Sequence, residues 1–233
     1  MKKLGIIGAM EQEVESLVAL LEQVRSTEYA GSRFYEGVLE GLDVVVVRCG
    51  IGKVNAALCV QILCDRFAVT HIVNTGIAGS LCARLDIGDL VISSGAMYHD
   101  VDVCAFGYPA GQVPGKPHVF EADSLLVNLA CQAAEAVHPG GSCVGTVASG
   151  DQFVCEKALK DKIIAVTQAL CAEMEGAAIA HAACRNEVPF VIIRAISDKA
   201  DDNADMDYPA FELMAAQRCA AVTRSLTALL RQA

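Results

Sequence analysis

The chain has 233 residues, of which 54% are hydrophobic and 20% are charged, so it is long and apolar enough to bury one large core. Its 28 acidic and 18 basic residues give a net charge of −10, which argues against binding nucleic acid through a basic face. No uninterrupted apolar run approaches the roughly 18 residues of a membrane helix, so no membrane partner is expected. We expect a single domain over residues 1–233.

The eleven cysteines do not predict a disulfide framework, because none forms a Cys-x-x-Cys pair, their number is odd and most lie in apolar runs. The five histidines are scattered without zinc spacing, and we expect neither a metal nor a cofactor. The N-terminus begins like a signal peptide but reaches Glu11 and Glu13 too soon. The chain is therefore expected to be cytoplasmic.

The first elements along the chain are predicted to be a strand, a helix and a hairpin. Lys3–Ile7 is an apolar strand, and Glu11–Arg25 is expected to be a helix because its apolar residues recur on one face. Two further strands, Arg33–Leu39 and Leu42–Arg48, are joined by Glu40-Gly41, which is typical of a hairpin turn.

Glu13 falls in the first turn of the expected helix, after the tight turn Gly8-Ala9-Met10. There it can stabilise the helix dipole, as Glu11 also could. It can instead carry a carboxylate to a ligand beside the end of the first strand. The residues alone leave both interpretations open.

A glycine-rich segment, Cys49–Asn55, follows the next strand and has the look of a phosphate-binding loop. A Walker loop would need glycine in place of Val47 and serine or threonine in place of Val54, and a dinucleotide loop would need glycine or alanine in place of Asn55. The glycines still bring backbone close to a ligand, but a phosphate loop is not predicted. The following helix is expected over Val54–Arg66.

The rest of the chain alternates strands, loops and helices. Asp123 is expected to cap a helix that runs to Ala136. A Gly/Pro-rich segment between Ala96 and Pro117 carries apolar side chains, which suggest an interface or a ligand lid. The further expected strands are His71–Asn74, Leu90–Ser94, Ser142–Ala148 and Phe190–Ile196. Loops are expected at Thr75–Ser80, Ser149–Val154 and Asp201–Asp207, and the final helix is expected over Ala210–Arg231.

Acidic residues stand where these later elements meet. Glu173 and Glu175 precede an alanine-rich helix, and Asp198 follows the buried strand Phe190–Ile196. Ligands of open α/β sheets lie at the carboxyl ends of the strands, so these acids suit a polar ligand. A structural interpretation is also open: Glu173 and Glu175 would favour a helix N-terminus, and Asp198 would cap a loop.

Alternating strands and helices, with some strands joined by hairpins, predict an α/β fold with a mixed, mainly parallel central sheet flanked by helices. The loops at the strand ends could then converge on one pocket. No lysine or arginine occurs in the segments Gly8–Glu13, Thr75–Ser80 and Ser149–Val154. A bound phosphate would favour such a partner, so a phosphate ligand is not expected.

Six motifs follow one another along the chain: Gly5–Val14, Gly50–Val54, Asn74–Gly76, Ser149–Asp151, Ala172–Gly176 and Arg194–Asp198. Taken together and in this order, they closely resemble those of the 5′-methylthioadenosine/S-adenosylhomocysteine nucleosidases of the nucleoside phosphorylase superfamily. The similarity covers essentially the whole chain. It implies a nucleoside phosphorylase-like fold and hydrolysis of an N-glycosidic bond to adenine and a 5-thioribose derivative, a reaction of methionine salvage.

The resemblance also implies roles for the acidic residues. Glu13 is implied to be the base that activates water, and Asp198 the acid that protonates adenine N7, with Ser197 orienting it. Glu175 would hold the ribose hydroxyls, with Met174 packed beneath the sugar. These roles suit the reaction, because cleavage of a glycosidic bond needs an acid for the leaving group and a base for water on the other side.

The remaining implied contacts surround the nucleoside. Phe153 would stack on adenine, and the backbone of Val154 would bind its edge. A homodimer is implied, in which Val103, Phe106 and Pro114 of one subunit cover the 5′-alkylthio group in the other. The other implied pocket residues are Ala9, Met10, Ile51, Ile77, Gly79, Glu173 and Tyr208.

Two residues depart from the family pattern. Ile77 stands where many relatives have serine, and Tyr208 stands where phenylalanine is common, which puts the preferred 5′ substituent in doubt. The nearest competing function is that of a nucleosidase for a futalosine-type nucleoside. The residues also leave open a phosphorolytic purine nucleoside phosphorylase and, from a different class of protein, a non-catalytic nucleoside-binding protein.

Overall fold

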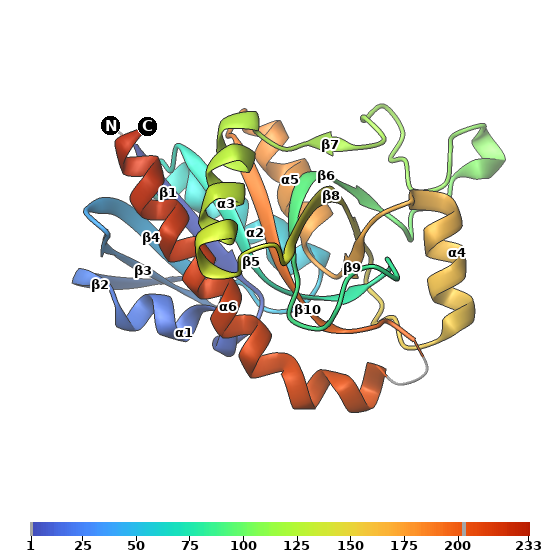
Figure 1. Cartoon of the computed structure of the whole chain (residues 1–233). Helices are drawn as coiled ribbons and strands as arrows, with labels where there is room; N and C mark the ends of the chain where they lie inside the picture. Colours follow the sequence, from blue (N-terminus) through green and yellow to red (C-terminus); the bar gives the residue numbers. More distant parts are fainter. Residues whose placement is uncertain (1, 202–203) are drawn as a thin grey trace.

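The computed structural model describes residues 2–201 and 204–233, which form a ten-stranded mixed sheet with helices packed around it (Figure 1). The strands are β1 Lys3–Gly8, β2 Glu22–Tyr29, β3 Ser32–Leu39, β4 Leu42–Arg48, β5 His71–Ser80, β6 Leu90–Tyr98, β7 Phe120–Glu121, β8 Ser142–Ser149, β9 Cys171–Glu173 and β10 Phe190–Asp198. The helices are α1 Glu11–Ala19, α2 Lys53–Phe67, α3 Ser124–Val137, α4 Lys157–Thr167, α5 Gly176–Arg185 and α6 Ala204–Gln232, with a short 3-10 helix at Cys104–Phe106. The expected α/β fold with a mixed sheet flanked by helices is confirmed.

The sheet closes on itself at one end. The strand order is β10-β6-β8-β9-β5-β1-β4-β3-β2, and β10 also pairs with β5, so β10, β6, β8, β9 and β5 form a ring. Parallel ladders join β1 to β4 and β5, β5 to β10, and β8 to β6 and β9. The strands β1 and β10 flank β5, which brings their carboxyl ends to the same edge of the sheet.

Apolar side chains cover both faces of this sheet. The α2 and α5 helices pack on one face, and α1, α3 and α6 pack on the other (Figure 1). Between the layers, β10 is buried along its whole length, because it pairs on both sides and is covered on both faces. None of the described helices is long and apolar enough to span a membrane.

The hairpin turn and the helix cap predicted from local residues are confirmed. Glu40 and Gly41 both have left-handed φ angles, 51° and 76°, as the two central residues of a tight hairpin turn between β3 and β4 require. The Asp123 carboxylate accepts a hydrogen bond from the backbone N–H of Leu126 at 2.9 Å and so caps α3.

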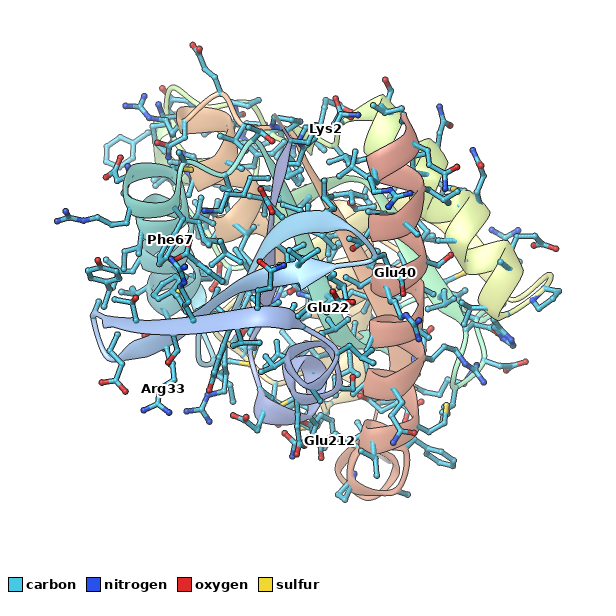
Figure 2. All side chains as sticks on the ribbon, turned by 90° about the vertical axis from the view of Figure 1, so that its left-hand side faces the viewer. Lys2, Glu22, Arg33, Glu40, Phe67 and Glu212 are labelled. Carbon is cyan, nitrogen blue, oxygen red and sulfur yellow. The ribbon has the colours of Figure 1, made fainter. Side chains whose placement is uncertain are left out.

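The helix expected over Glu11–Arg25 is too long. It ends at Ala19, and the chain then forms the edge strand β2 (Figure 2). Leu21 and Val24 follow Leu17 at helical spacing, but the side chain of Val24 is 47% exposed. Tertiary structure overrides this local pattern, because pairing of β2 with β3 provides hydrogen bonds for the backbone groups that a longer helix would have paired.

Several other expected boundaries are also wrong. The segment Thr75–Ser80 belongs to β5, and Asp198 is the last residue of β10, because these two strands continue to pair beyond their apolar runs. The final helix starts at Ala204, so most of the expected loop Asp201–Asp207 is helical. Positions 202 and 203 of that loop lie outside the described residues.

Candidate active site

A cavity of about 530 Å³ lies at the carboxyl ends of β1, β5 and β10, beside the junction of β9 and α5. Most of the residues implied by the resemblance line it. The lining comprises Ala9, Met10, Glu13, Ile51, Ile77, Ala78, Gly79, Phe153, Ala172, Glu173, Met174, Glu175, Ser197, Asp198 and Tyr208. Ala78 and Ala172 are not predicted as site residues, because alanine offers no chemical signal by which sequence could single them out.

Glu13 is fixed at the end of β1 by backbone donors. One of its oxygens, Oε2, accepts hydrogen bonds from the N–H groups of Ala9 at 2.6 Å and Met10 at 3.0 Å. The other, Oε1, accepts one from Ile77 N–H at 3.1 Å, across the sheet on β5. The carboxylate thus joins β1, α1 and β5, while Glu13 is only 4% exposed.

Close approach of Glu13 to β5 depends on Gly76. A Cβ atom at Gly76 would lie 2.4 Å from Glu13 Oε1 and 2.8 Å from a nitrogen of Arg194, both far inside contact distance. This explains in physical terms why glycine stands within a buried strand, where it ordinarily weakens pairing.

Asp198 forms another part of the cavity wall. Its Oδ2 accepts a hydrogen bond from the Ser197 hydroxyl at 2.8 Å, and its Oδ1 accepts one from Ala200 N–H at 2.8 Å. Gly79 faces it, and a Cβ there would lie 2.7 Å from Asp198 Oδ1. Ser197 and Asp198 are 1% and 2% exposed, so both are shielded from solvent although they line a cavity.

Glu175 lies at the start of α5, where its Oε1 accepts a hydrogen bond from Gly52 N–H at 2.8 Å. Gly52 belongs to the glycine-rich segment after β4, so this segment positions an acid rather than a phosphate. Burial raises the pKa of Glu175 to about 8, and the nearby charge of Glu173 adds to the effect. A carboxyl group with this pKa is mostly protonated at neutral pH.

A buried network supports the floor of the cavity from behind. Arg194 forms an ion pair with Glu173 and donates a hydrogen bond to Asn74 Oδ1. Glu173 accepts hydrogen bonds from the Ser149 hydroxyl and from the N–H groups of Glu175 and Gly176. In the sequence, Arg194 stands out only as the one charged residue of an apolar strand; its partners are far away along the chain.

The network also sets the charge balance of the site. Burial raises the pKa of Glu13 above its ordinary value, an effect that the charge of Arg194 and three backbone donors oppose. Burial lowers the pKa of Arg194, but the charges of Glu173, Glu13 and Glu175 outweigh it and raise this pKa overall. One guanidinium cation is therefore shared by several acids.

Aromatic and thioether side chains form the outer part of the cavity. Phe153 is 46% exposed, and its ring meets the Tyr208 ring edge-on at 5.6 Å. The Tyr208 hydroxyl donates to Met10 Sδ at 3.1 Å and lies 3.3 Å from Glu212 Oε1. Val154 is buried and lines a small adjoining cavity of about 40 Å³, rather than the main one.

Known proteins match the chain over nearly its whole length. The phosphorylase superfamily matches residues 3–230. A 5′-methylthioadenosine/S-adenosylhomocysteine nucleosidase of Shewanella frigidimarina is 43% identical over 227 residues, which are 96% of this chain and 98% of the relative. The chain belongs to this nucleosidase family within the phosphorylase superfamily.

Solved structures agree with this family membership. The Neisseria meningitidis nucleosidase in complex with methylthio-immucillin-A has a TM-score of 0.96 at 40% identity, over 98% of this chain and all of that one. A futalosine hydrolase mutant of Helicobacter pylori has a TM-score of 0.93 at 33% identity, over 97% of this chain and 98% of that one. The resemblance identified from six sequence motifs is confirmed.

The residues that the nucleosidase resemblance assigns to a partner subunit lie away from this cavity. Val103, Phe106 and Pro114 belong to the loop between β6 and β7, which projects on the right of Figure 1. Phe106 is 81% exposed, the highest value among the large exposed apolar side chains of the described residues. The three residues do not line the cavity of their own chain.

Proposed function

We propose that this chain hydrolyses the N-glycosidic bond of 5′-methylthioadenosine and S-adenosylhomocysteine. The observation that carries the proposal is that Glu13 and Asp198, both buried, line one cavity and are fixed by separate sets of hydrogen bonds. Paired carboxyl groups can act as base and acid on opposite sides of a glycosidic bond. Family membership supports the same reaction.

The two carboxyl groups have different tasks in the proposed reaction. Ionised Glu13 takes a proton from a water molecule, whose oxygen attacks the anomeric carbon of the ribose. As the bond from that carbon to adenine N9 breaks, its electron pair passes into adenine, and Asp198 donates a proton to N7. Each positioned acid or base accelerates such a reaction by about 10²–10⁴-fold.

The other proposed contacts hold the nucleoside between these two groups. Glu175 accepts hydrogen bonds from the ribose hydroxyls, and Met174 packs beneath the sugar. Phe153 stacks on adenine, whose edge meets the backbone beside Val154. The remaining proposed contacts come from Ala9, Met10, Ile51, Ile77, Gly79, Glu173, Ser197 and Tyr208.

Water, rather than phosphate, is the proposed nucleophile. No lysine or arginine is among the described residues that line the cavity. Arg194 lies behind the floor and is occupied by Glu173 and Asn74. A phosphorolytic enzyme would need a cation for its phosphate. Release of free adenine from methylthioadenosine in phosphate-free buffer tests the proposal; cleavage only when phosphate is added would overturn it.

A futalosine-type nucleoside is the second candidate substrate, which the likeness to the Helicobacter pylori futalosine hydrolase favours. Measuring kcat/KM for release of the free base from each nucleoside, with one enzyme preparation, decides between the candidates. We expect methylthioadenosine to be preferred, since the relative that is 43% identical is named a 5′-methylthioadenosine/S-adenosylhomocysteine nucleosidase.

We also propose that one domain, residues 1–233, works as a cytoplasmic homodimer. Phe106 and Pro114 are exposed on this loop and Val103 is half-buried, which supports an interface in which each loop covers the partner's cavity. All eleven cysteines are unpaired, which suits a reducing compartment. Sedimentation analysis tests the dimer, and a monomer at assay concentration would contradict it.

A further inference from the structure

A second cavity, of about 460 Å³, adjoins the candidate active site. The two share Ala9, Met10 and Ile51 as common walls. Met10 also accepts a hydrogen bond from Tyr208, a residue linked above to the choice of 5′ substituent, so the shared wall lies beside that end of the nucleoside. The rest of its lining comes from the start of α1, the turn between β2 and β3, and the end of β4: Glu11, Gln12, Gly31, Ser32, Arg48, Cys49 and Gly50.

The second cavity differs from the first in its charges. It contains an ion pair between Arg48 Nη1 and Glu11 Oε2 at 3.3 Å, and both side chains are 57% exposed. Its wall is held to the active site by backbone hydrogen bonds from Cys49 N–H to Gly8 O at 2.9 Å and from Gly50 N–H to Ala9 O at 3.1 Å. Arg48 is thus placed beside the main cavity by paired strands.

We propose that this second cavity binds the amino-acid end of S-adenosylhomocysteine. The inference rests on the proposed nucleosidase function. S-Adenosylhomocysteine differs from methylthioadenosine at the sulfur, where a methyl group is replaced by a chain that ends in an ammonium and a carboxylate on one carbon. Arg48 holds the carboxylate, and Glu11 holds the ammonium.

The geometry of the pair suits these two charges. Guanidinium and carboxylate stand side by side, as the opposite charges of an amino acid do. The Arg48 guanidinium has five N–H donors in a planar fork, so it can bind a carboxylate through two hydrogen bonds. An exposed ion pair contributes little to stability, and it can therefore open for a ligand at small cost.

The experiment measures kcat/KM for four substrates with the native enzyme, Arg48→Gln and Glu11→Gln. The substrates are methylthioadenosine, S-adenosylhomocysteine, its deaminated analogue, which keeps the carboxylate, and its decarboxylated analogue, which keeps the ammonium. We expect Arg48→Gln to lower the ratio of kcat/KM for S-adenosylhomocysteine to kcat/KM for methylthioadenosine by about tenfold, which is the effect of losing one charge-assisted hydrogen bond. For the deaminated analogue, kcat/KM should fall as much in Arg48→Gln as it does for S-adenosylhomocysteine. For the decarboxylated analogue, kcat/KM should fall more in Glu11→Gln than in Arg48→Gln.

Arg33→Gln is the matched control. Arg33 forms an ion pair with Glu28 at 2.5 Å, with side chains 56% and 67% exposed, and it is labelled on the outer side of the β2–β3 hairpin in Figure 2. It follows Ser32 in sequence but does not line the second cavity. Its removal changes the net charge as Arg48→Gln does, so the substrate ratio should stay at the native value.

Two results would overturn the inference. One is an equal loss for all substrates in Arg48→Gln, which would make Arg48 a general support of the site. The other is the same selective loss in Arg33→Gln, which would make the effect one of overall charge. Failure of the native enzyme to release adenine from methylthioadenosine would instead overturn the proposed function, so the two failures are distinguishable.

Discussion

The buried acids of this site are held by different sets of hydrogen-bond donors. Glu13 accepts hydrogen bonds from three backbone N–H groups, and these bonds favour the ionised form that a base requires. Asp198 has a neighbouring hydroxyl as well as a backbone donor, and Glu175 has one backbone donor. Three carboxyl groups in one cavity can therefore serve in the proposed reaction as base, acid and ribose ligand.

Replacing Asp198 by Asn tests the proton donor. Asparagine is nearly isosteric and keeps a hydrogen-bond donor, but it cannot supply a proton. We expect Asp198→Asn to fold and to bind adenine, yet to lose at least ~10²-fold in kcat for methylthioadenosine. A nitrophenyl riboside, whose leaving group needs no protonation, is the control substrate. Equal losses on both substrates would show that Asp198 is not the acid.

The raised pKa of Glu175 predicts a pH dependence of substrate capture. Its carboxyl must be ionised to accept two ribose hydroxyls, and burial raises its pKa to about 8. Below that pH most free enzyme carries the proton, so we expect kcat/KM to rise with pH up to about 8. Glu175→Gln should remove this limb from the profile, although its activity is lower. An identical limb in both enzymes would assign it to another group.

At the scale of elements, the site depends on how closely β5 approaches its neighbours. Gly76→Ala would place a methyl group 2.4 Å from Glu13 Oε1, so Glu13 or the strand must move. We expect kcat/KM to fall by about 10²-fold, since misplacing a catalytic group by about 1 Å costs that much. Gly5→Ala on β1 is the control, because its nearest neighbour is a Leu63 methyl at 3.1 Å, away from the cavity. Comparable losses in both variants would indicate a general packing defect.

The loop between β6 and β7 carries the prediction for the dimer. If Phe106 covers the alkylthio group in the partner's site, Phe106→Ala should raise KM for methylthioadenosine more than for adenosine, which lacks that group. A several-fold difference is expected, because burial of one or two apolar groups is worth about 1–3 kcal/mol. Steady-state kinetics with both nucleosides measures it. Equal changes in KM would contradict the proposed lid.

Sequence is informative about elements wherever local residues decide the structure. The Glu40-Gly41 turn and the Asp123 cap depend on neighbours within a few residues, and both are predicted correctly. The first half of the edge strand β2, up to Arg25, is wrongly predicted to be helical because Leu21 and Val24 fit a helical period, and only pairing with β3 decides against it.

For the site, the residues from Ala9 to Tyr208 are predicted through the family resemblance, and the structure brings most of them to one cavity. The contacts of Arg194 could not be foreseen. They join strands whose adjacency follows from the closed ring of the sheet, and a single strand's pattern carries no information about that ring.

At the scale of the whole molecule, several acids are buried around one cation, and this arrangement opposes folding at high pH. Glu13 and Glu175 both have raised pKa values, to about 8 for Glu175. Between the unfolded value near 4.5 and the folded value, the folded chain binds more protons than the unfolded chain. The free energy of unfolding contributed by these groups therefore falls as pH rises through this range, and it levels off above it.

Thermal unfolding of the ligand-free enzyme tests this linkage. One additional bound proton changes the free energy of unfolding by about 1.4 kcal/mol per pH unit, which is roughly 3–6 °C in Tm for a chain of this size. We expect Tm of the native enzyme to fall as pH rises from 5 to 8. In Glu175→Gln this fall should be less steep, by up to that amount per pH unit, because glutamine binds no proton in either state. It should also be more stable than the native enzyme at pH 8. Glu22→Gln is the control, since Glu22 is exposed on the edge strand β2 (Figure 2). If Tm of Glu175→Gln follows the native curve as Glu22→Gln does, then Glu175 is not protonated by burial, and the pH dependence assigned to it in catalysis fails with it.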